Sequence, residues 1–275
     1  MAHANADELV ETDGASELAG EKKKTVRDVD RMGGFAKGLA VIEAFGKGRD
    51  RLTIAEVARL SGLDRASARR CLLTLVEQDY AVADDRYFEL TPRILKLGQS
   101  YLSASLPQLL RPALSQLAGR IGESCSAAVL DHTEVVYIAR ATQHHIVGTG
   151  LHPGSRLPAY CTSLGRVLLA ALSPDAARKR IEASVRQPLT GHTLTSVKDI
   201  MAELTRVREQ GYSIIDQEVA PNSLSIGIPV INSTGSTVAA INVGLHASRG
   251  TKERMIDDIL PALLDVKRYL AETLP

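Results

Sequence analysis

The sequence has no tryptophan, and aromatic residues make up only 4% of its 275 residues. Surfaces that bind single-stranded nucleic acid by base stacking need aromatic side chains, so this class is disfavoured. The three cysteines, Cys71, Cys125 and Cys161, lie far apart and form no Cys-x-x-Cys pair. This spacing disfavours both a zinc ribbon and a disulfide framework. We therefore expect neither a metal nor a cofactor.

Long apolar runs are also missing. No stretch approaches the roughly 18 apolar residues that a membrane-spanning helix needs, and residues 1–31 lack the apolar core of a signal peptide. We expect a cytoplasmic protein without a membrane partner. Lys and Arg total 33 against 32 Asp and Glu, a net charge of +1, which excludes a polycation. A small basic face could still be diluted by a larger neutral domain.

The length is typical of two domains, and the composition changes along the chain. Residues 1–31 are polar and predict a disordered tail, because they cannot bury enough apolar surface to fold. We expect a first domain over residues 32–91, a linker helix over 92–106 that ends before Pro107, and a second domain over 107–275.

The first domain has the pattern of a winged helix-turn-helix. Apolar residues from Phe35 to Phe45 predict one helix, and Thr53 with Glu56 forms the capping box of a second. Gly62 ends that helix, Asp64 caps a third, and Ala68, Cys71, Leu72 and Leu75 give the third helix a buried stripe. Two short strands follow, around Asp84–Asp85. The third helix would enter the major groove of double-stranded DNA.

Basic and hydroxyl side chains gather where such a domain meets DNA. Arginine is the commonest reader of guanine in the major groove, and the start of a capped helix offers N–H groups to a phosphate. The candidate DNA-binding residues are Thr53, Arg65, Ser67, Arg69, Arg70 and Arg86. A helical domain with a merely solvated basic face is the alternative. Arg70 flanks the buried stripe and could instead pair with an acidic residue inside the domain.

The second domain mixes strand and helix patterns, with hairpins at Asp131–His132 and at Asn232–Gly235. Helices are expected from Pro112 to Ile121, after Thr162 or Ser163, after Ser173, from Ser196 to Gln210 and near the C-terminus. Hairpins combined with helices predict an α+β domain built on an antiparallel sheet, which differs from a dinucleotide-binding fold.

The run from Arg156 to Arg166 leads directly into a helix start, where free N–H groups favour a small anion such as a carboxylate. Arg140 and Arg156 are candidate counter-ions, and Tyr160 could supply a ring and a hydroxyl. Thr162 and Ser163 could also simply cap a core helix, and the two roles are compatible. Asp216 and Glu218 could bind ligand hydroxyls or form ion pairs.

Enzymatic signatures are missing: the sequence contains no Gly-x-Ser-x-Gly, His-Glu-x-x-His or phosphate-binding loop motif. His144 and His145 with Cys161 could be imagined as a metal or nucleophile site. No base or oxyanion partner for Cys161 is identifiable, however. We therefore expect a protein that is not an enzyme, while an enzyme for a small acid fused to a DNA-binding module remains the alternative.

The chain resembles the IclR family of bacterial transcriptional regulators over nearly its whole length after the tail. The resemblance lies in Leu52–Ala58, Ser61–Leu63 and Arg70–Leu75 of the first domain, and in Arg156–Ala170, Gly211–Tyr212 and the Asp216–Glu218 pair of the second. The run RLPAYCTSLGRVLLA is similar to the PcaR/PcaU/PobR subgroup, which controls catabolism of protocatechuate and 4-hydroxybenzoate. The resemblance implies a GAF-like effector domain and a homodimer or dimer of dimers on a palindromic operator.

Family ligands lie between this helix start and the facing strands. Carried over by position, the resemblance implies effector-binding roles for Ser163, Leu164, Ser223, Ser225, Asn242 and Gly244, beside Arg140, Tyr160 and Asp216. Ile215, Asn242 and Gly244 depart from a glyoxylate-type pattern, which suits a larger, flatter acid. We expect a DNA-binding regulator that responds to a small aromatic or dicarboxylic acid. A second domain that serves only oligomerisation is a further alternative.

Overall fold

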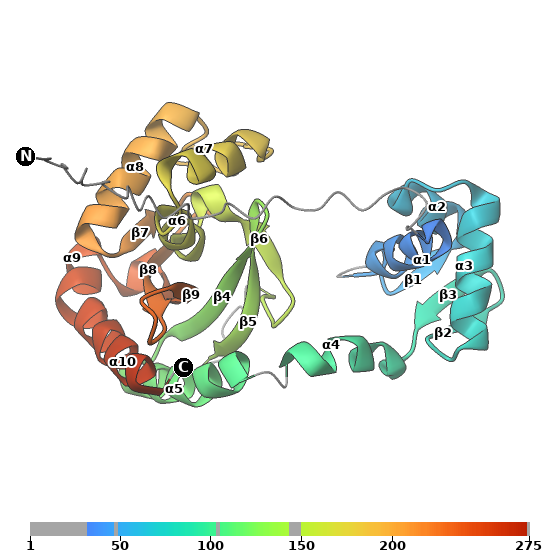
Figure 1. Ribbon diagram of the computed structural model, residues 1–275, viewed down its shortest axis with the longest axis horizontal. Helices are drawn as coiled ribbons and strands as arrows, with labels where there is room; N and C mark the ends of the chain where they lie inside the picture. Colours follow the sequence, from blue (N-terminus) through green and yellow to red (C-terminus); the bar gives the residue numbers. More distant parts are fainter. Residues whose placement is uncertain (1–31, 47–48, 103–104, 143–149, 274–275) are drawn as a thin grey trace, which may run out of the picture. The chain divides into compact units, whose positions relative to one another are not determined.

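The computed structural model describes residues 32–46, 49–102, 105–142 and 150–273. The tail predicted for residues 1–31 and the pair His144–His145 lie outside these ranges. The chain divides into two compact units, one up to Leu95 and one from Lys96 onward, and each is described by itself (Figure 1).

Three helices and a small antiparallel sheet form the first unit. The helices are α1 (Gly33–Ala44), α2 (Ile54–Ser61) and α3 (Arg65–Glu77), and the strands are β1 (Arg51–Thr53), β2 (Ala81–Asp84) and β3 (Tyr87–Leu90). The strand order is β1-β3-β2, so the hairpin of β2 and β3 is extended by β1, which the sequence did not predict. Val41, Val57, Leu72 and Phe88 are buried in its core.

Local signals set the helix boundaries of this unit. The Thr53 hydroxyl accepts from the N–H of Glu56, Gly62 ends α2 with a φ of 69°, and the Asp64 carboxylate accepts from the N–H of Ser67. A left-handed residue after a helix favours glycine, because an L side chain there is strained. These capping predictions are confirmed. The hairpin turns at Asp85, which also has a positive φ, of 53°.

The segment that follows consists of a 3-10 turn and two helices: η2 (Pro92–Ile94), α4 (Leu95–Leu102) and α5 (Ser105–Ile121). The sequence predicted that a helix would start at Pro112, but α5 starts seven residues earlier and contains both Pro107 and Pro112. Pro107 lies in the first turn, where its missing N–H costs nothing. Pro112 removes one helical hydrogen bond, while Leu110 and Leu114 are fully buried on either side of it.

A twisted antiparallel sheet forms the centre of the second unit. Its strands are β4 (Ser124–Asp131), β5 (Glu134–Ala141), β6 (Arg156–Pro158), β7 (Ser213–Asp216), β8 (Ser223–Ile231) and β9 (Thr237–His246), in the order β6-β5-β4-β9-β8-β7. The helical elements are η3 (Ala159–Cys161), α6 (Ser163–Ala170), α7 (Pro174–Ala183), α8 (Val197–Gln210), η4 (Ala247–Arg249), α9 (Lys252–Arg254), the π-helical turn η5 (Met255–Ile259) and α10 (Leu260–Thr273).

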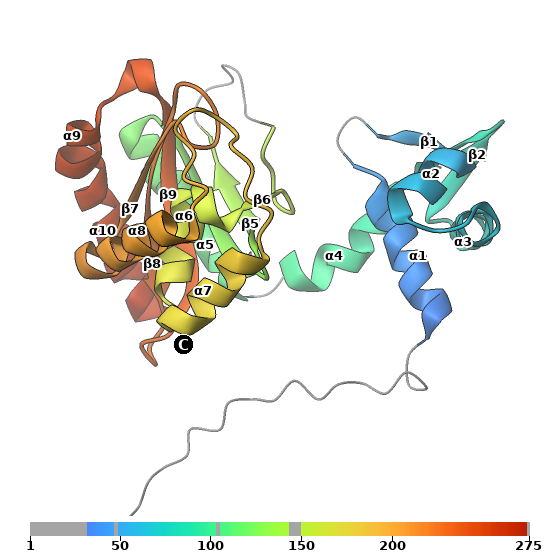
Figure 2. The same ribbon diagram turned by 90° about the horizontal axis from the view of Figure 1, so that it is seen from above.

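Helices cover both faces of this sheet (Figures 1 and 2). On one face α5 and α10 pack against β4, β5 and β8, and on the other α6 packs against β8 and β9 with α7 and α8 outside it. Each face has its own core: one contains Leu114, Ile226 and Ile241, and the other Leu164, Leu169 and Leu204. The structure therefore confirms the predicted α+β fold. None of the helices in the described ranges is long and apolar enough to cross a membrane.

Candidate functional site

Arginines project from the first two turns of α3. Arg65, Arg69 and Arg70 are exposed, as is Ala66 between them. Arg70 forms no ion pair with another described residue. Its backbone carbonyl accepts a hydrogen bond from the Thr74 hydroxyl. The outer face of α3 therefore presents three guanidinium groups, which matches what a DNA-reading helix requires.

Ser67 was predicted on this outer face, and that placement is wrong. Its side chain is 3% exposed, and its hydroxyl accepts a hydrogen bond of 3.1 Å from the ammonium of Lys37 on α1. Ser67 is the third residue of α3 and faces α1, because its position lies beside the stripe that begins at Ala68. The contact joins α1 to the start of α3. Nothing in the sequence pattern pointed to Lys37.

Thr53 at the start of α2 is occupied by its own capping box. Its N–H and its hydroxyl both donate to the Glu56 carboxylate at 2.8 Å. These hydrogen bonds lower the pKa of Glu56, chiefly through the Thr53 backbone. The groups of Thr53 predicted for a phosphate are thus already taken by a carboxylate, and the amides of Ile54 and Ala55 are the remaining donors of this turn.

Arg86 lies in the hairpin turn as predicted, and it is exposed. Its guanidinium stacks 5.1 Å from the centre of the Tyr87 ring and donates to the Tyr87 hydroxyl at 3.1 Å. Arg51 stacks on the same ring at 5.3 Å and pairs with Asp84. Stacking on an aromatic ring restricts an arginine without neutralising it, so Arg86 presents an ordered positive charge at the turn, beside the exposed Asp85.

In the second unit, the start of α6 provides the predicted anion-favouring helix end. Thr162 caps the helix: its hydroxyl accepts from the N–H of Gly165 at 3.1 Å and donates to the Pro158 carbonyl at 3.1 Å. Within the described residues, the N–H groups of Ser163 and Leu164 have no recorded acceptor. The helix packs tightly on β8, since a Cβ on Gly227 would lie 3.0 Å from the Ser163 carbonyl carbon.

A row of polar residues crosses the sheet beneath this helix start. The register pairs Arg140 on β5 with Ser126 on β4, Ser126 with Asn242 on β9, and Asn242 with Gly227 on β8. Residues directly opposite one another on antiparallel strands share a face of the sheet. The Asn242 amide donates to the Ser163 hydroxyl at 3.2 Å, so this is the face that α6 covers.

Arg140 lies at the open end of this row. It is partly buried, and burial lowers the pKa of its guanidinium below the usual value, although the group stays charged at neutral pH. No carboxylate among the described residues pairs with it, while the thiol of Cys125 and the ring of Tyr137 lie close enough to influence it. A partly desolvated cation without a protein counter-ion is a good partner for a bound carboxylate.

The neighbouring row carries two further predicted residues. Gly244 is opposite both Ser124 and Ser225, and Ser225 is opposite Ile215. Ser124 and Ser126 were not foreseen as part of this face. Their alternation with Cys125 and Ala127 in a strand gave a signal, because one face of that strand is polar at two successive positions. Together Arg140, Ser126, Asn242, Gly244 and Ser225 line one polar floor.

Three predicted residues instead make contacts within the protein. Tyr160 is fully buried, and its hydroxyl donates to the Gln187 carbonyl at 2.7 Å. Asp216 pairs with Lys252 at 3.1 Å and, opposite Leu224 in the register, lies on the other face of the sheet. The Ser223 hydroxyl donates to the Ala220 carbonyl at 2.6 Å, closing the turn before β8.

Arg156 was considered as a second counter-ion for a ligand, and the structure gives it another role. Its guanidinium binds both Asp131 and Glu134 at 2.7 Å on the surface strand β6. Hydrogen bonds to Glu134, and also to Asp131, raise the pKa of Arg156. The cation is thus neutralised locally, which leaves Arg140 as the remaining candidate counter-ion, on the α6 face.

Arg166 and Glu218 form a buried ion pair that the sequence left open. The Arg166 side chain is 2% exposed and donates to Glu218 at 2.7 Å and to the Tyr160 carbonyl at 3.0 Å. Glu218 also accepts from the N–H of Leu194 at 3.0 Å, and Glu203 on α8 lies 4.0 Å from Arg166. The ion pair thus connects α6 to the segment that contains Glu218, and through Glu218 to Leu194.

Cys161 is unsuited to act as a nucleophile. It is fully buried, and burial raises the pKa of its thiol to about 11, so the thiol is protonated at neutral pH. The described residues contain no group of three or more ligands that could hold a metal ion. The geometry therefore gives the enzymatic alternative no support.

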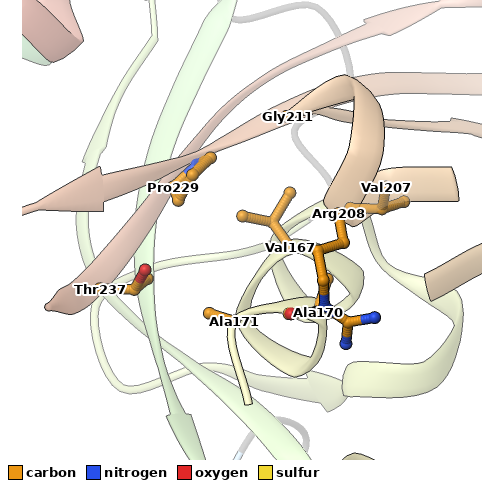
Figure 3. Close-up of a pocket in the computed structure, with 8 residues that line it drawn as sticks. All are labelled: Val167, Ala170, Ala171, Val207, Arg208, Gly211, Pro229 and Thr237. Carbon is orange, nitrogen blue, oxygen red and sulfur yellow. Dashed lines mark hydrogen bonds between the residues drawn. The ribbon is translucent and has the colours of Figure 1, made fainter. Parts of the chain in front are cut away.

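A separate pocket lies at the far end of α6, between α6, α8 and the strands β8 and β9 (Figure 3). Its walls include Val167, Ala170 and Pro229, and Arg208 at its rim donates to the carbonyls of Ala170 and Leu172. This arginine completes the C-terminal end of α6. Because these two carbonyls already engage its guanidinium, we assign the candidate ligand site to the start of α6.

Comparisons with known proteins agree with both halves of this description. The model of the IclR helix-turn-helix domain matches residues 35–85, and that of the bacterial transcriptional regulator IclR C-terminal domain matches residues 99–271. The Pca regulon regulatory protein of Pseudomonas putida is 37% identical over 249 residues, which cover 90% of this chain and 86% of that protein.

Two solved structures are also similar. A putative transcriptional regulator from Rhodococcus sp. RHA1 is 40% identical, with a TM-score of 0.78 over 89% of this chain and 98% of that one. The inducer-binding domain of PobR from Acinetobacter, in a double mutant bound to 3-hydroxybenzoic acid, is 32% identical. Its TM-score is 0.58 over 61% of this chain and 98% of that one.

Proposed function

The chain belongs to the IclR family of bacterial transcriptional regulators, and on that basis we propose that it binds a hydroxylated aromatic acid at the start of α6 and couples this binding to operator DNA. The observation that carries the proposal is Arg140, which has no protein counter-ion among the described residues. Its strand β5 lies two strands from β9, where Asn242 bonds Ser163 at the start of α6. The Acinetobacter domain bound to 3-hydroxybenzoic acid supports the ligand class.

The spacing of the strands suits a flat acid with polar groups at both ends. Arg140 on β5 and Asn242 on β9 are separated by β4, so their backbones are about 10 Å apart. We propose that a single substituted benzene ring bridges the side chains of these two residues. The carboxylate would pair with Arg140, and the hydroxyl end would reach Ser163 and Leu164, over a floor of Ser126 and Gly244.

Titration calorimetry of the full chain tests this arrangement. We expect 4-hydroxybenzoate or protocatechuate to bind, and Arg140→Gln to weaken binding by about tenfold to a hundredfold, because a charge-assisted hydrogen bond contributes about 1.5–3 kcal/mol. Arg156→Gln is the matched control, since it removes an equal charge from the same domain and should leave the affinity unchanged. If Arg140→Gln bound within twofold of the wild type, the carboxylate would have to be held elsewhere.

The DNA-binding half of the proposal assigns base contacts to Arg65, Arg69 and Arg70, and backbone contacts to Arg86. We propose a homodimer or dimer of dimers that reads a palindromic operator, because a two-fold protein matches a two-fold site. Met32 just before α1, Phe35 and Leu39 on α1, and Leu97 and Tyr101 on α4 are exposed apolar side chains that such an assembly could cover. A regulator of this kind works in the cytoplasm, where the chromosome lies.

Gel-shift titration addresses the DNA-binding half. Arg65→Ala combined with Arg69→Ala should weaken binding to the operator strongly, because each base-reading arginine contributes roughly 1–3 kcal/mol. Arg86→Ala should weaken binding to all sequences alike and reduce its dependence on salt. Unaltered retardation by the double variant would contradict the assignment of α3 as the reading helix.

A further inference from the structure

An exposed leucine lies among the arginines of α3. Leu73 is 41% exposed, whereas Leu72 and Leu75 on either side of it are buried in the core of the first unit. Leu73 follows Arg69 by four residues and Arg70 by three, so it lies on the same helix face one turn further along. The core of its own domain therefore does not account for an apolar side chain at this position.

The outward residues of α3 have the spacing of a base-reading surface. Ala66, Arg69, Arg70 and Leu73 are all exposed and stand at positions i, i+3, i+4 and i+7. Homeodomain recognition helices contact bases through side chains with this spacing. The rise between Arg69 and Leu73 is about 6 Å, so Leu73 would meet the base pair one or two steps beyond those that the arginines contact.

We propose that Leu73 reads the 5-methyl group of a thymine in the major groove. Of the groups that base pairs present there, this methyl is the apolar one, and it is the natural partner for an apolar side chain one turn beyond two arginines. Leu73 would thereby select a T·A pair next to the guanines that Arg69 and Arg70 select. This inference rests on the proposed role of α3 in DNA binding.

The experiment removes the methyl group from the DNA and the leucine from the protein. The full chain selects duplexes from a random-sequence pool, and the enriched duplex is then synthesised with deoxyuridine in place of thymidine at single positions. Uracil keeps the base pairing of thymine and lacks only the methyl. We expect wild-type affinity to fall about fourfold at one position per half-site, from about 0.8 kcal/mol per buried methyl-sized group.

Leu73→Ala should bind the two duplexes equally, and Leu73→Met, which remains apolar, should retain a preference for thymine. Leu264→Ala is the matched control, because Leu264 has the same exposure of 41% but lies on α10 of the other unit. It should keep the wild-type preference. The inference would be overturned if wild-type affinity were the same with and without the methyl at every position, or if Leu73→Ala kept the preference for thymine. Neither result would contradict the proposed role of the arginines. If no duplex is enriched, the proposed DNA binding itself fails.

Discussion

Breaking the buried pair of Arg166 and Glu218 should destabilise the second unit by about 3 kcal/mol. Glu218→Gln keeps the shape of the side chain but leaves the guanidinium, which is 2% exposed, without its charged partner. Removing one member of a buried ion pair costs about 3–5 kcal/mol, because the remaining charge stays desolvated. Glu203, 4.0 Å from Arg166, offers partial compensation, so we expect the lower end of this range.

Amide hydrogen exchange followed by mass spectrometry locates the loss. A change of about 3 kcal/mol should accelerate exchange by about a hundredfold in peptides covering Thr190–Leu194 and β7. The amides of these peptides exchange when the second unit opens. Urea denaturation gives the same free energy if the slope of the transition is unchanged. Peptides of α1 to α3 serve as internal controls and should exchange at the wild-type rate.

Two further variants separate the contribution of the buried ion pair from that of side-chain packing. Asp265→Asn removes the exposed partner of Arg120 and Arg268 and should leave stability within error of the wild type. Arg166→Met combined with Glu218→Leu replaces both charges by apolar groups and should recover most of the lost stability. A loss below about 1 kcal/mol in Glu218→Gln would refute the reasoning, since it would mean that Arg166 is hydrated or paired in another way.

Two other predictions concern packing and thiol reactivity. Gly165→Ala should lower the melting temperature by about 5–10 °C in a thermal scan, because the new Cβ would lie 2.2 Å from the Ala159 carbonyl oxygen. Gly98→Ala is the control and should not lower the melting temperature, because a Cβ added there would have no atom within 4 Å. Burial raises the pKa of Cys125 to about 12 and that of Cys161 to about 11, so both thiols stay protonated at pH 8. Cys71 is only partly buried, whereas Cys125 and Cys161 are fully buried. A disulfide reagent should therefore modify Cys71 alone in the native protein and all three cysteines in denaturant, and a second rapidly reacting thiol would contradict this burial.

Features that depend on neighbouring residues in the chain were predictable from the sequence. The starts of α2, α3, α7 and α8 were predicted from Thr53, Asp64, Ser173 and Ser196, whose side chains each accept a hydrogen bond from the amide three residues further on. The Thr-x-x-Glu pattern of a capping box and a glycine at a left-handed position are local signals. The winged helix-turn-helix followed from them.

Features that depend on strand register were not predictable. Arg140, Ser126 and Asn242 form one row only because β4 lies between β5 and β9, and more than a hundred residues separate β4 from β9 along the chain. The predicted exposure of Ser67 was wrong for a related reason. The helical pattern of α3 placed Ser67 at the border of the buried stripe, and the position of α1 decided its burial. The ion pairs of Arg156 were not predicted because its acidic partners belong to the preceding hairpin.

The two outermost strands of the large sheet are short: β6 has three residues and β7 has four. Short edges expose few unpaired backbone groups and give another chain little to extend by strand addition. Copies of this domain would consequently associate through the side chains of their helices and loops. Assembly of that kind is reversible and sensitive to single substitutions, which would suit the proposed regulator if its contacts between copies change when the effector binds.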